Sequence, residues 1–359
     1  MAQGPLNGIK VVEFAGLGPA PFCCMLLSDM GAEVVTIDRK GSTPPGPTDV
    51  TGRGRLHLAS DLKDPVSVAA CRELAAKADI LIEGFRPGVM ERLGLGPDLL
   101  LQDNPALVYG RMTGWGQSGP YSQMAGHDIN YIAITGALHA IGPADTPVVP
   151  LNLIGDFGGG ALYLALGVVA ALHHARATGQ GQVVDCAISD GTASLMAMQY
   201  GLKAAGLWAD QRASNLIDGG SHYYGPYRCA DGAWISLGAV EPQFYRQLLE
   251  LLEIDDPDFA AQNDASQWPS LRAKLETVIA AQPRSHWIER LGASDACFAP
   301  VLSMSEAPDD LHNHHRGTFV TVDDVVQPAP APRFSATPSE IQRHDVDADF
   351  ASILFRWTG

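Results

Sequence analysis

The chain has 359 residues, 46% of them hydrophobic and 18% charged, which is enough for one large or two ordinary domains with full hydrophobic cores. Its formal net charge is −16, so we expect no nucleic-acid partner and no general attraction to anionic membranes. Residues 1–113 nevertheless hold 11 of the 24 Lys and Arg and only 13 of the 40 Asp and Glu. This nearly neutral first third is where we look for a site that binds an anion.

The cysteines and the apolar segments predict a reduced, cytoplasmic protein. Six cysteines are scattered without a Cys-x-x-Cys pair, and a chain of this size needs no disulfides. The N-terminus lacks the pattern of a signal peptide. The longest apolar run, 157–172, is shorter than the roughly 18 residues of a membrane span, so we expect a buried helix there and no membrane span.

His312, His314 and His315 lack the spacing of zinc ligands, and we expect no metal.

In the first half of the chain, strands alternate with helices. Hydrophobic patterning predicts strands at 9–15, 33–38, 79–83, 106–111 and 182–188, helices at 22–30 and 65–77, and a further helix that follows a glycine-rich turn at 155–160 and runs to about 175. Such alternation is typical of an α/β fold with a parallel sheet. We therefore predict a Rossmann-like, doubly wound large domain.

From residue 227 onward the pattern changes. Asp231-Gly232 between two short apolar runs predicts a β-hairpin, and amphipathic helices are expected at 242–252, 269–281 and 285–291. This is the pattern of a smaller α+β domain. The predicted organisation has four parts: a large domain at 1–188 completed by 330–359, linker helices at 189–224, a small domain at 225–318, and an extended, proline-rich return linker at 319–339.

The turn after the first strand resembles a dinucleotide-binding loop in part. Gly16-Leu17-Gly18-Pro19-Ala20-Pro21 is followed about twenty residues later by Asp38. Pro21, however, occupies the third glycine position, and Arg39 directly follows the acidic residue. We favour a Rossmann-like turn with no nucleotide on it and keep a nicotinamide oxidoreductase as a rival.

Four basic residues of the first third stand at or soon after the ends of strands: Arg39, Lys63, Arg86 and Arg92. The carboxyl ends of parallel strands line the ligand crevice of an open α/β sheet, so these side chains could converge on phosphate groups. Ordinary solvated surface charge is an equally good explanation for them from the sequence alone.

Three acid–base residues stand out, and each has a structural alternative. His127 follows a glycine- and proline-rich segment, but a lone histidine is more often structural than catalytic. Asp156 precedes an apolar helix, where a carboxylate could simply cap the helix. Glu241 likewise stands at the start of a predicted helix.

Taken in order along nearly the whole chain, these segments resemble the α-methylacyl-CoA racemases of the family III CoA-transferase superfamily. The resemblance is carried by Val34–Arg39, Ser60–Lys63, Glu83–Leu93, Ala125–Tyr131, Pro150–Leu153, Gly155–Phe157, Gly179–Val183, Asn215–Gly220, Gly238–Tyr245 and Asp295–Cys297.

The resemblance implies that His127 and Asp156 are two catalytic bases and that Glu241 is hydrogen-bonded to His127. It also implies an interlocked homodimer in which Glu241 reaches His127 across the interface. Coenzyme A would lie along the first domain. The residues expected to bind the substrate and its CoA are Arg39, Ser60, Asp61, Leu62, Lys63, Gly84, Phe85, Arg86, Arg92, Gly126, Asp128, Ile129, Asn130 and Tyr131.

The implied reaction explains these residue types. Inverting a carbon next to a thioester removes its α-proton from one face and returns a proton from the other, so two acid–base groups must flank one point. We expect a 2-methyl-branched acyl-CoA as substrate, no separate cofactor, and enolate-stabilising N–H groups at 126–128. Two alternatives remain: a family III CoA-transferase with Asp156 as nucleophile, and an acyl-CoA carrier without turnover.

Overall fold

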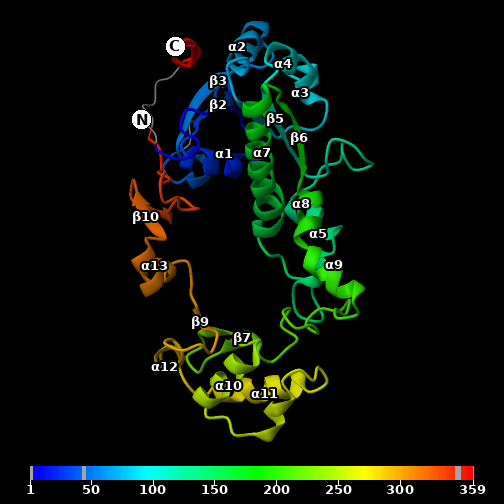
Figure 1. Ribbon diagram of the computed structural model, residues 1–359, viewed down its shortest axis with the longest axis vertical. Coiled ribbons are helices and arrows are strands. Elements are labelled where there is room, and N and C mark those ends of the chain that lie inside the picture. Colours follow the sequence, from blue (N-terminus) through cyan, green and yellow to red (C-terminus); the bar gives the residue numbers. More distant parts are fainter. Residues whose placement is uncertain (1–2, 43–45, 344–348, 359) are drawn as a thin grey trace. The chain divides into compact units, whose positions relative to one another are not determined.

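The computed structural model describes residues 3–42, 46–343 and 349–358. They form two compact units (Figure 1). The larger unit consists of Met1–Thr135, Pro150–Met196 and Gly317–Gly359, and the smaller one of Gly136–Val149 and Ala197–Arg316. Residues 197–224, which the sequence predicted as linker helices, belong to the smaller unit.

The larger unit is built on a six-stranded parallel sheet. In the order in which they lie across the sheet, its strands are β3 (Arg55–Ser60), β2 (Glu33–Arg39), β1 (Lys10–Phe14), β4 (Ile80–Glu83), β5 (Val108–Thr113) and β6 (Gln182–Ala187). The order reverses between β1 and β4, which is where the carboxyl ends of a doubly wound sheet leave a crevice for a ligand. The predicted α/β fold is confirmed, and all five predicted strands are present.

Helices cover both faces of this sheet, as a buried parallel sheet requires. On one face of the sheet lie α1 (Pro19–Asp29) and α7 (Leu162–Thr178) (Figure 1). They pack against apolar residues of β1, β2, β4 and β5. On the other, α2 (Pro65–Ala75), α4 (Pro97–Asp103) and the C-terminal α14 (Phe350–Thr358) share a second core with Val12, Phe14 and Leu81.

The strand that the sequence did not predict, β3, carries charged side chains on one face. Its Arg55 forms a buried ion pair with Glu13 of β1, and Thr36 of β2 donates a hydrogen bond of 2.5 Å to the same carboxylate. Leu56 and Leu58 point into the opposite core. Glu13 and Thr36, both distant in sequence, thus supply the opposite charge and the hydrogen bond that the polar face of this strand needs.

A π-helical segment, η2 (Leu153–Ala161), runs directly into α7 and makes one helix of 26 residues. The helix begins earlier than the sequence predicted. It is the one described helix long and apolar enough to cross a membrane, but Leu164, Val168 and Leu172 are buried against the sheet. We therefore assign it to the core of the larger unit.

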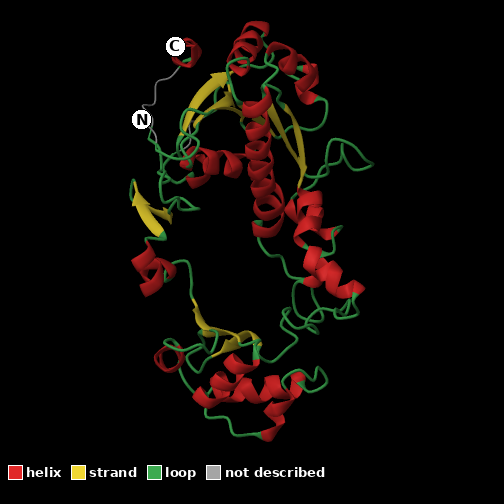
Figure 2. Ribbon diagram, viewed as in Figure 1, coloured by secondary structure: helices red, strands yellow, loops and turns green. Residues whose placement is uncertain are grey.

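The smaller unit contains a three-stranded antiparallel sheet covered by helices (Figure 2). Its strands are β7 (Tyr224–Arg228), β8 (Trp234–Gly238) and β9 (Phe298–Val301), and its main helices are α10 (Pro242–Leu251), α11 (Trp268–Ile279) and α12 (Arg284–Leu291). Strand and helix residues share one core, which includes Tyr227, Ile235, Leu248, Leu271 and Trp287. The predicted hairpin and the three predicted helices are confirmed.

Where the sequence predicted an extended return linker at 319–339, the chain forms an antiparallel hairpin of β10 (Phe319–Val322) and β11 (Val325–Pro328). Asp323 and Asp324 connect the strands with φ of 50° and 63°, the left-handed conformation of a tight hairpin turn that Asp tolerates. The remaining short elements are η1 (Val50–Gly52), α3 (Val89–Arg92), α5 (Asp128–Ala133), α6 (Ala137–Ala140), α8 (Ile188–Leu195), α9 (Ala197–Ala204), η3 (Pro257–Ala261), η4 (Ala307–Asp309) and α13 (Leu311–Arg316).

Candidate active site

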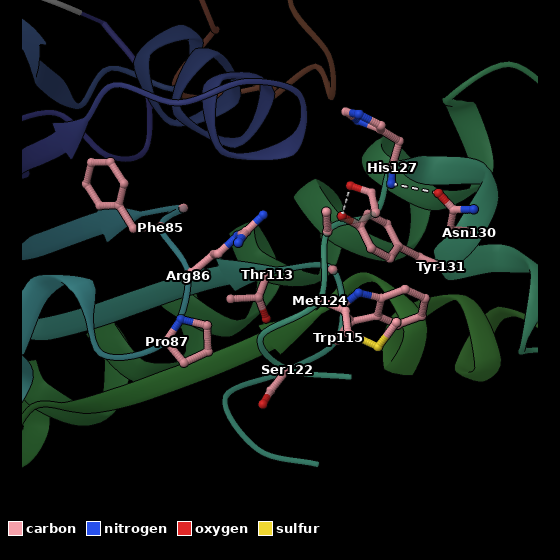
Figure 3. Close-up of a pocket in the computed structure, with 14 residues that line it drawn as sticks. Phe85, Arg86, Pro87, Thr113, Trp115, Ser122, Met124, His127, Asn130 and Tyr131 are labelled. Carbon is pink, nitrogen blue, oxygen red and sulfur yellow. Dashed lines mark hydrogen bonds between the residues drawn. The ribbon is translucent and has the colours of Figure 1, made fainter. Parts of the chain in front are cut away.

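A cavity of about 520 Å³ opens at the carboxyl ends of β4 and β5. Three segments line it: Gly84–Pro87 after β4, Thr113–Trp115 at the end of β5, and residues between Ser122 and Tyr131 that lead into α5. Figure 3 shows the Arg86 side chain reaching from the end of β4 toward Tyr131. A groove with one guanidinium and several aromatic rings suits a ligand that has both anionic and apolar parts.

The Tyr131 ring, in the wall of this cavity, packs closely against the backbone of two glycines. A Cβ atom on Gly114 would lie 2.0 Å from the Tyr131 ring, and one on Gly126 would lie 2.7 Å from it. Trp115 packs edge-on against the ring with centroids 4.7 Å apart, and the Tyr131 hydroxyl donates to the carbonyl of Gly126. Both glycines are therefore required by close packing, and the ring fixes the backbone that immediately precedes His127.

His127 occupies the N-cap position of α5, and its side chain is exposed. Its backbone N–H donates to the side-chain oxygen of Asn130 at 3.0 Å (Figure 3). The Asn130 N–H donates back to the His127 carbonyl at 2.8 Å. Such reciprocal bonds satisfy polar groups at a helix start and fix the direction of the chain. The imidazole is thus attached to a rigid turn while its ring is accessible.

Asp156 lies inside η2, so the capping role that the sequence allowed for it is wrong: Asn152 is the N-cap residue. The Asp156 carboxylate is half-buried. Burial raises its pKa, and the nearby charge of Asp128 raises it further, whereas the Asn152 side chain and His127 act in the opposite direction. His127 and Asp156 therefore lie close enough to interact electrostatically, and Asp156 favours its protonated form more than an exposed carboxyl group does.

The glycine-rich turn after β1 packs closely against the Asp156 carboxylate. Gly18 has a φ of 71°, and a Cβ atom placed on it would lie 3.0 Å from Oδ2 of Asp156. The turn that resembles a dinucleotide loop thus has a carboxylate packed against it. A carboxylate at this point would repel a pyrophosphate, which argues against the nicotinamide rival.

The basic residues expected at phosphate groups are not all brought to one place. Arg86 lines the cavity. Arg39 ends β2, Lys63 follows β3, and Arg92 ends the short helix α3; all three side chains are exposed and outside the cavity lining.

The other residues expected at the substrate are distributed similarly. Gly84, Phe85, Gly126, Asn130 and Tyr131 line the cavity. The remaining five lie outside the cavity lining: Ser60 is buried at the end of β3, Asp61 accepts the N–H of Lys63, Leu62 packs on the second core, Asp128 is partly buried, and Ile129 is exposed.

Glu241 belongs to the smaller unit, at the N-cap position of α10. Its side chain is exposed and makes no capping hydrogen bond within the described residues. The helix-start role that the sequence allowed therefore does not use this carboxylate. Its charge acts on Cys297, whose thiol has a pKa raised by burial first and by Glu241 second.

Several residues at the site were missed by the sequence reasoning. Thr113, Gly114 and Trp115 line the cavity, and Gly18 and Asn152 lie beside Asp156. The available signal was the position of Thr113–Trp115 just after a predicted strand. Within the described ranges, no group of three or more His, Cys, Asp and Glu side chains is arranged to hold a metal ion.

Known proteins resemble this chain over nearly its full length. The family described as CoA-transferase family III matches residues 6–346. α-Methylacyl-CoA racemases of Mus musculus and Homo sapiens are 45% and 43% identical to it, each over 93% of this chain and 87% of the relative. A succinyl-CoA:L-malate CoA-transferase beta subunit of Chloroflexus aurantiacus is 29% identical, over 94% of this chain and 90% of the relative.

A solved structure has the same architecture. The crystal structure of a CAIB/BAIF family protein from Brucella suis superposes with a TM-score of 0.82 at 25% sequence identity, covering 99% of each chain. The family match, the two mammalian relatives and this likeness agree with one another. The chain belongs to CoA-transferase family III.

Proposed function

We propose that the protein is an isomerase that interconverts (2R)- and (2S)-2-methylacyl-CoA thioesters by moving one α-proton. The proposal is supported by the mammalian relatives, which are named α-methylacyl-CoA racemases. The observation that carries it is the pairing of the exposed His127 imidazole, which lines the cavity, with the half-buried Asp156 carboxylate, whose pKa is raised and on which His127 acts electrostatically. A two-base inversion needs one group that starts free and one that can hold a proton.

In the proposed reaction, His127 removes the α-proton of the S epimer, and the C–H electron pair passes into a planar enolate. Asp156 then delivers its own proton to the opposite face of the carbon, which gives the R epimer. The reverse direction starts with ionised Asp156 and protonated His127. Each turnover leaves the two groups with exchanged protonation states, so solvent must restore them.

The enolate oxygen needs hydrogen-bond donors aimed at it. The sequence pointed to the backbone N–H groups of 126–128, but the His127 N–H already donates to Asn130. We therefore assign this role to the N–H groups of Gly126 and Asp128. Arg86 would pair with a phosphate group of CoA, because a guanidinium on a cavity wall binds phosphate with two parallel hydrogen bonds.

Further parts of the proposal concern assembly and context. We propose a homodimer in which Glu241 of one subunit accepts a hydrogen bond from His127 of the other. The Glu241 carboxylate, which makes no capping hydrogen bond, supports this assembly. So do leucines of η2, α7 and α8 that are about half exposed or more: Leu153, Leu162, Leu166 and Leu195.

We also propose that the enzyme works in the cytoplasm and needs no cofactor besides the CoA of its substrate.

A single incubation tests the proposed activity. A pure (2S)-2-methylacyl-CoA is incubated with the protein in deuterated buffer, and the epimer ratio and α-deuterium content are followed together. We expect the mixture to approach equal amounts of both epimers while deuterium enters at the α-carbon. Binding of the thioester without either change would identify a carrier and overturn the proposal.

The CoA-transferase alternative predicts a covalent acyl group on Asp156. The small-domain loop reads Gly238-Ala239-Val240-Glu241 and lacks the glycine run expected of those relatives, so we favour the racemase. Hydroxylamine trapping of an acyl-enzyme, or transfer of CoA to a free carboxylic acid without epimerisation, would reverse this preference.

A further inference from the structure

A second carboxylate, Asp128, is packed directly on the backbone that carries Asp156. Asp128 is the first residue of α5, and its Oδ1 accepts the backbone N–H of Asp156 at 2.6 Å. The N–H of Gly155 points to the same carboxylate, and a Cβ atom on Gly155 would lie 2.2 Å from Oδ1. Gly155 thus leaves just enough space for Asp128, which ties the start of α5 to the π-helical turn of η2.

The other oxygen of Asp128 is unusual. Oδ2 is buried and has no hydrogen-bond partner within the described residues. A buried, incompletely solvated carboxylate keeps its electric field largely unscreened, so it acts strongly on charges beside it. Burial raises the pKa of Asp128 itself, whereas the N–H groups of Asp156 and Gly155 that it accepts act in the opposite direction. Once ionised, Asp128 raises the pKa of Asp156 through its charge.

The remaining neighbours of Asp156 do not supply a second anion. His127 and Tyr131 approach it from the α5 side, and Asn152 approaches from the start of η2. From α1, the Gly18 backbone contacts it and brings no charge. Asp128 is therefore the one described anionic side chain that acts on Asp156.

We propose that Asp128 is a positioning residue for the proton transfer: its carboxylate fixes the turn that carries Asp156 and presents a negative charge to the Asp156 carboxyl group. This inference rests on the proposed function and names how its second base is tuned. Repulsion between the two carboxylates favours protonated Asp156, which is the form that must deliver a proton to the enolate. The same residue thus links the helix that bears one base to the helix that bears the other.

The Asp128→Asn variant separates the effect of the negative charge from that of the hydrogen bond that fixes the turn. Its side-chain oxygen can still accept the Asp156 N–H, but the negative charge is gone. We expect the pH midpoint for α-proton removal from the R epimer to move lower by about one pH unit, and the S-to-R rate at neutral pH to fall about tenfold. Asp128→Ala removes both contributions, so we expect a larger loss in kcat with little change in KM.

The control is Asp49→Asn. Asp49 also accepts a backbone N–H, from Gly52 at 3.0 Å, but it lies outside the cavity lining. The Asp49→Asn variant should leave the pH profile of α-proton removal unchanged. If Asp128→Asn has the same profile as the unaltered protein, a purely structural role is established and the inference is overturned.

A titration that does not depend on activity separates this inference from the proposed function. The ¹³Cγ resonances of Asp128 and Asp156 are followed against pH in the unaltered protein and in Asp128→Asn. Coupled carboxyl groups respond to each other's ionisation, and the Asp156 midpoint should fall in the variant. Independent single transitions in the unaltered protein would overturn the inference even if Asp128→Asn failed to fold. Absence of α-proton exchange in the unaltered protein would instead overturn the proposed function.

Discussion

The two proposed bases occupy opposite environments. His127 is exposed at the start of a six-residue helix, where hydrogen bonds to its backbone fix the turn. Asp156 is half-buried in a π-helical turn, packed against the Gly18 backbone and close to a second carboxylate. Solvent exposure lets a base exchange its proton quickly, whereas burial and a like charge favour retention of the proton. The asymmetry lets two different residues begin a turnover in complementary protonation states.

The π-helix contributes to this difference. Its glycines allow a very close approach of α8: a Cβ atom on Gly159 would lie 2.5 Å from the Thr192 hydroxyl, and one on Gly191 would lie 1.8 Å from the Gly159 carbonyl oxygen. Phe157 is also fixed, by stacking on Phe22 with centroids 4.3 Å apart. Short π-helical turns often occur at functional sites, and here the turn places Asp156 beside Gly18.

The largest expected effect comes from removing either base. Asp156→Asn and His127→Ala should each lower the rate of epimerisation by about 10²–10⁴-fold, the usual range for loss of a general acid or base. The measurement is the epimer ratio by chiral separation. Epimerisation at an unchanged rate in either variant would show that the missing group is not one of the two bases.

Gly18→Ala should damage mainly the Asp156 side. The new methyl group meets Oδ2 at 3.0 Å, and the combination of φ 71° with ψ −114° adds strain of about 1–3 kcal/mol to a residue that has a Cβ. We expect α-proton removal from the R epimer to slow about tenfold, because a small displacement of a catalytic group is costly. Removal from the S epimer should slow less. Equal slowing of both, measured by deuterium uptake from each pure epimer, would contradict the assignment of Asp156 to one face.

Asn130→Ala should have a smaller effect, on the His127 side. It removes the acceptor of the His127 N–H, a bond that contributes about 1 kcal/mol. We expect a several-fold loss in α-proton removal from the S epimer and a smaller loss for the R epimer. A selective loss for the R epimer, in the same deuterium assay, would reverse the two assignments.

The smallest expected effect concerns stability. The pKa of Asp156 is raised in the folded protein, so the unfolded chain loses this proton first as the pH rises, and folding becomes less favourable above the unfolded pKa. Asp156→Asn should therefore raise Tm by a few degrees at pH 7, and the gain should disappear below the ordinary carboxyl pKa of about 4. Thermal unfolding monitored by circular dichroism at both pH values checks this, and a gain that persists in acid would rule out ionisation as its cause.

The sequence predicted the sheet well because buried parallel strands are continuous apolar runs. It missed β3 because the charge of Arg55 interrupts the apolar pattern, and its neutralising partner Glu13 comes from another strand. The glycine run at 158–160 indicated a turn, yet it is helical because α8 packs closely on it. The identities of His127 and Asp156 came from the resemblance, whereas the roles of Gly18 and Asp128 depend on contacts that no local pattern reveals.

The central claim is that His127 and Asp156 act on opposite faces of one carbon. It is tested most directly by α-deuterium uptake from each pure epimer in deuterated buffer, with Asp156→Asn and His127→Ala as the two enzymes. We predict that Asp156→Asn exchanges the α-proton of the S epimer without inversion and leaves the R epimer unchanged, and that His127→Ala shows the reverse. Exchange of both epimers by one variant, or inversion by either at the unaltered rate, would contradict the claim.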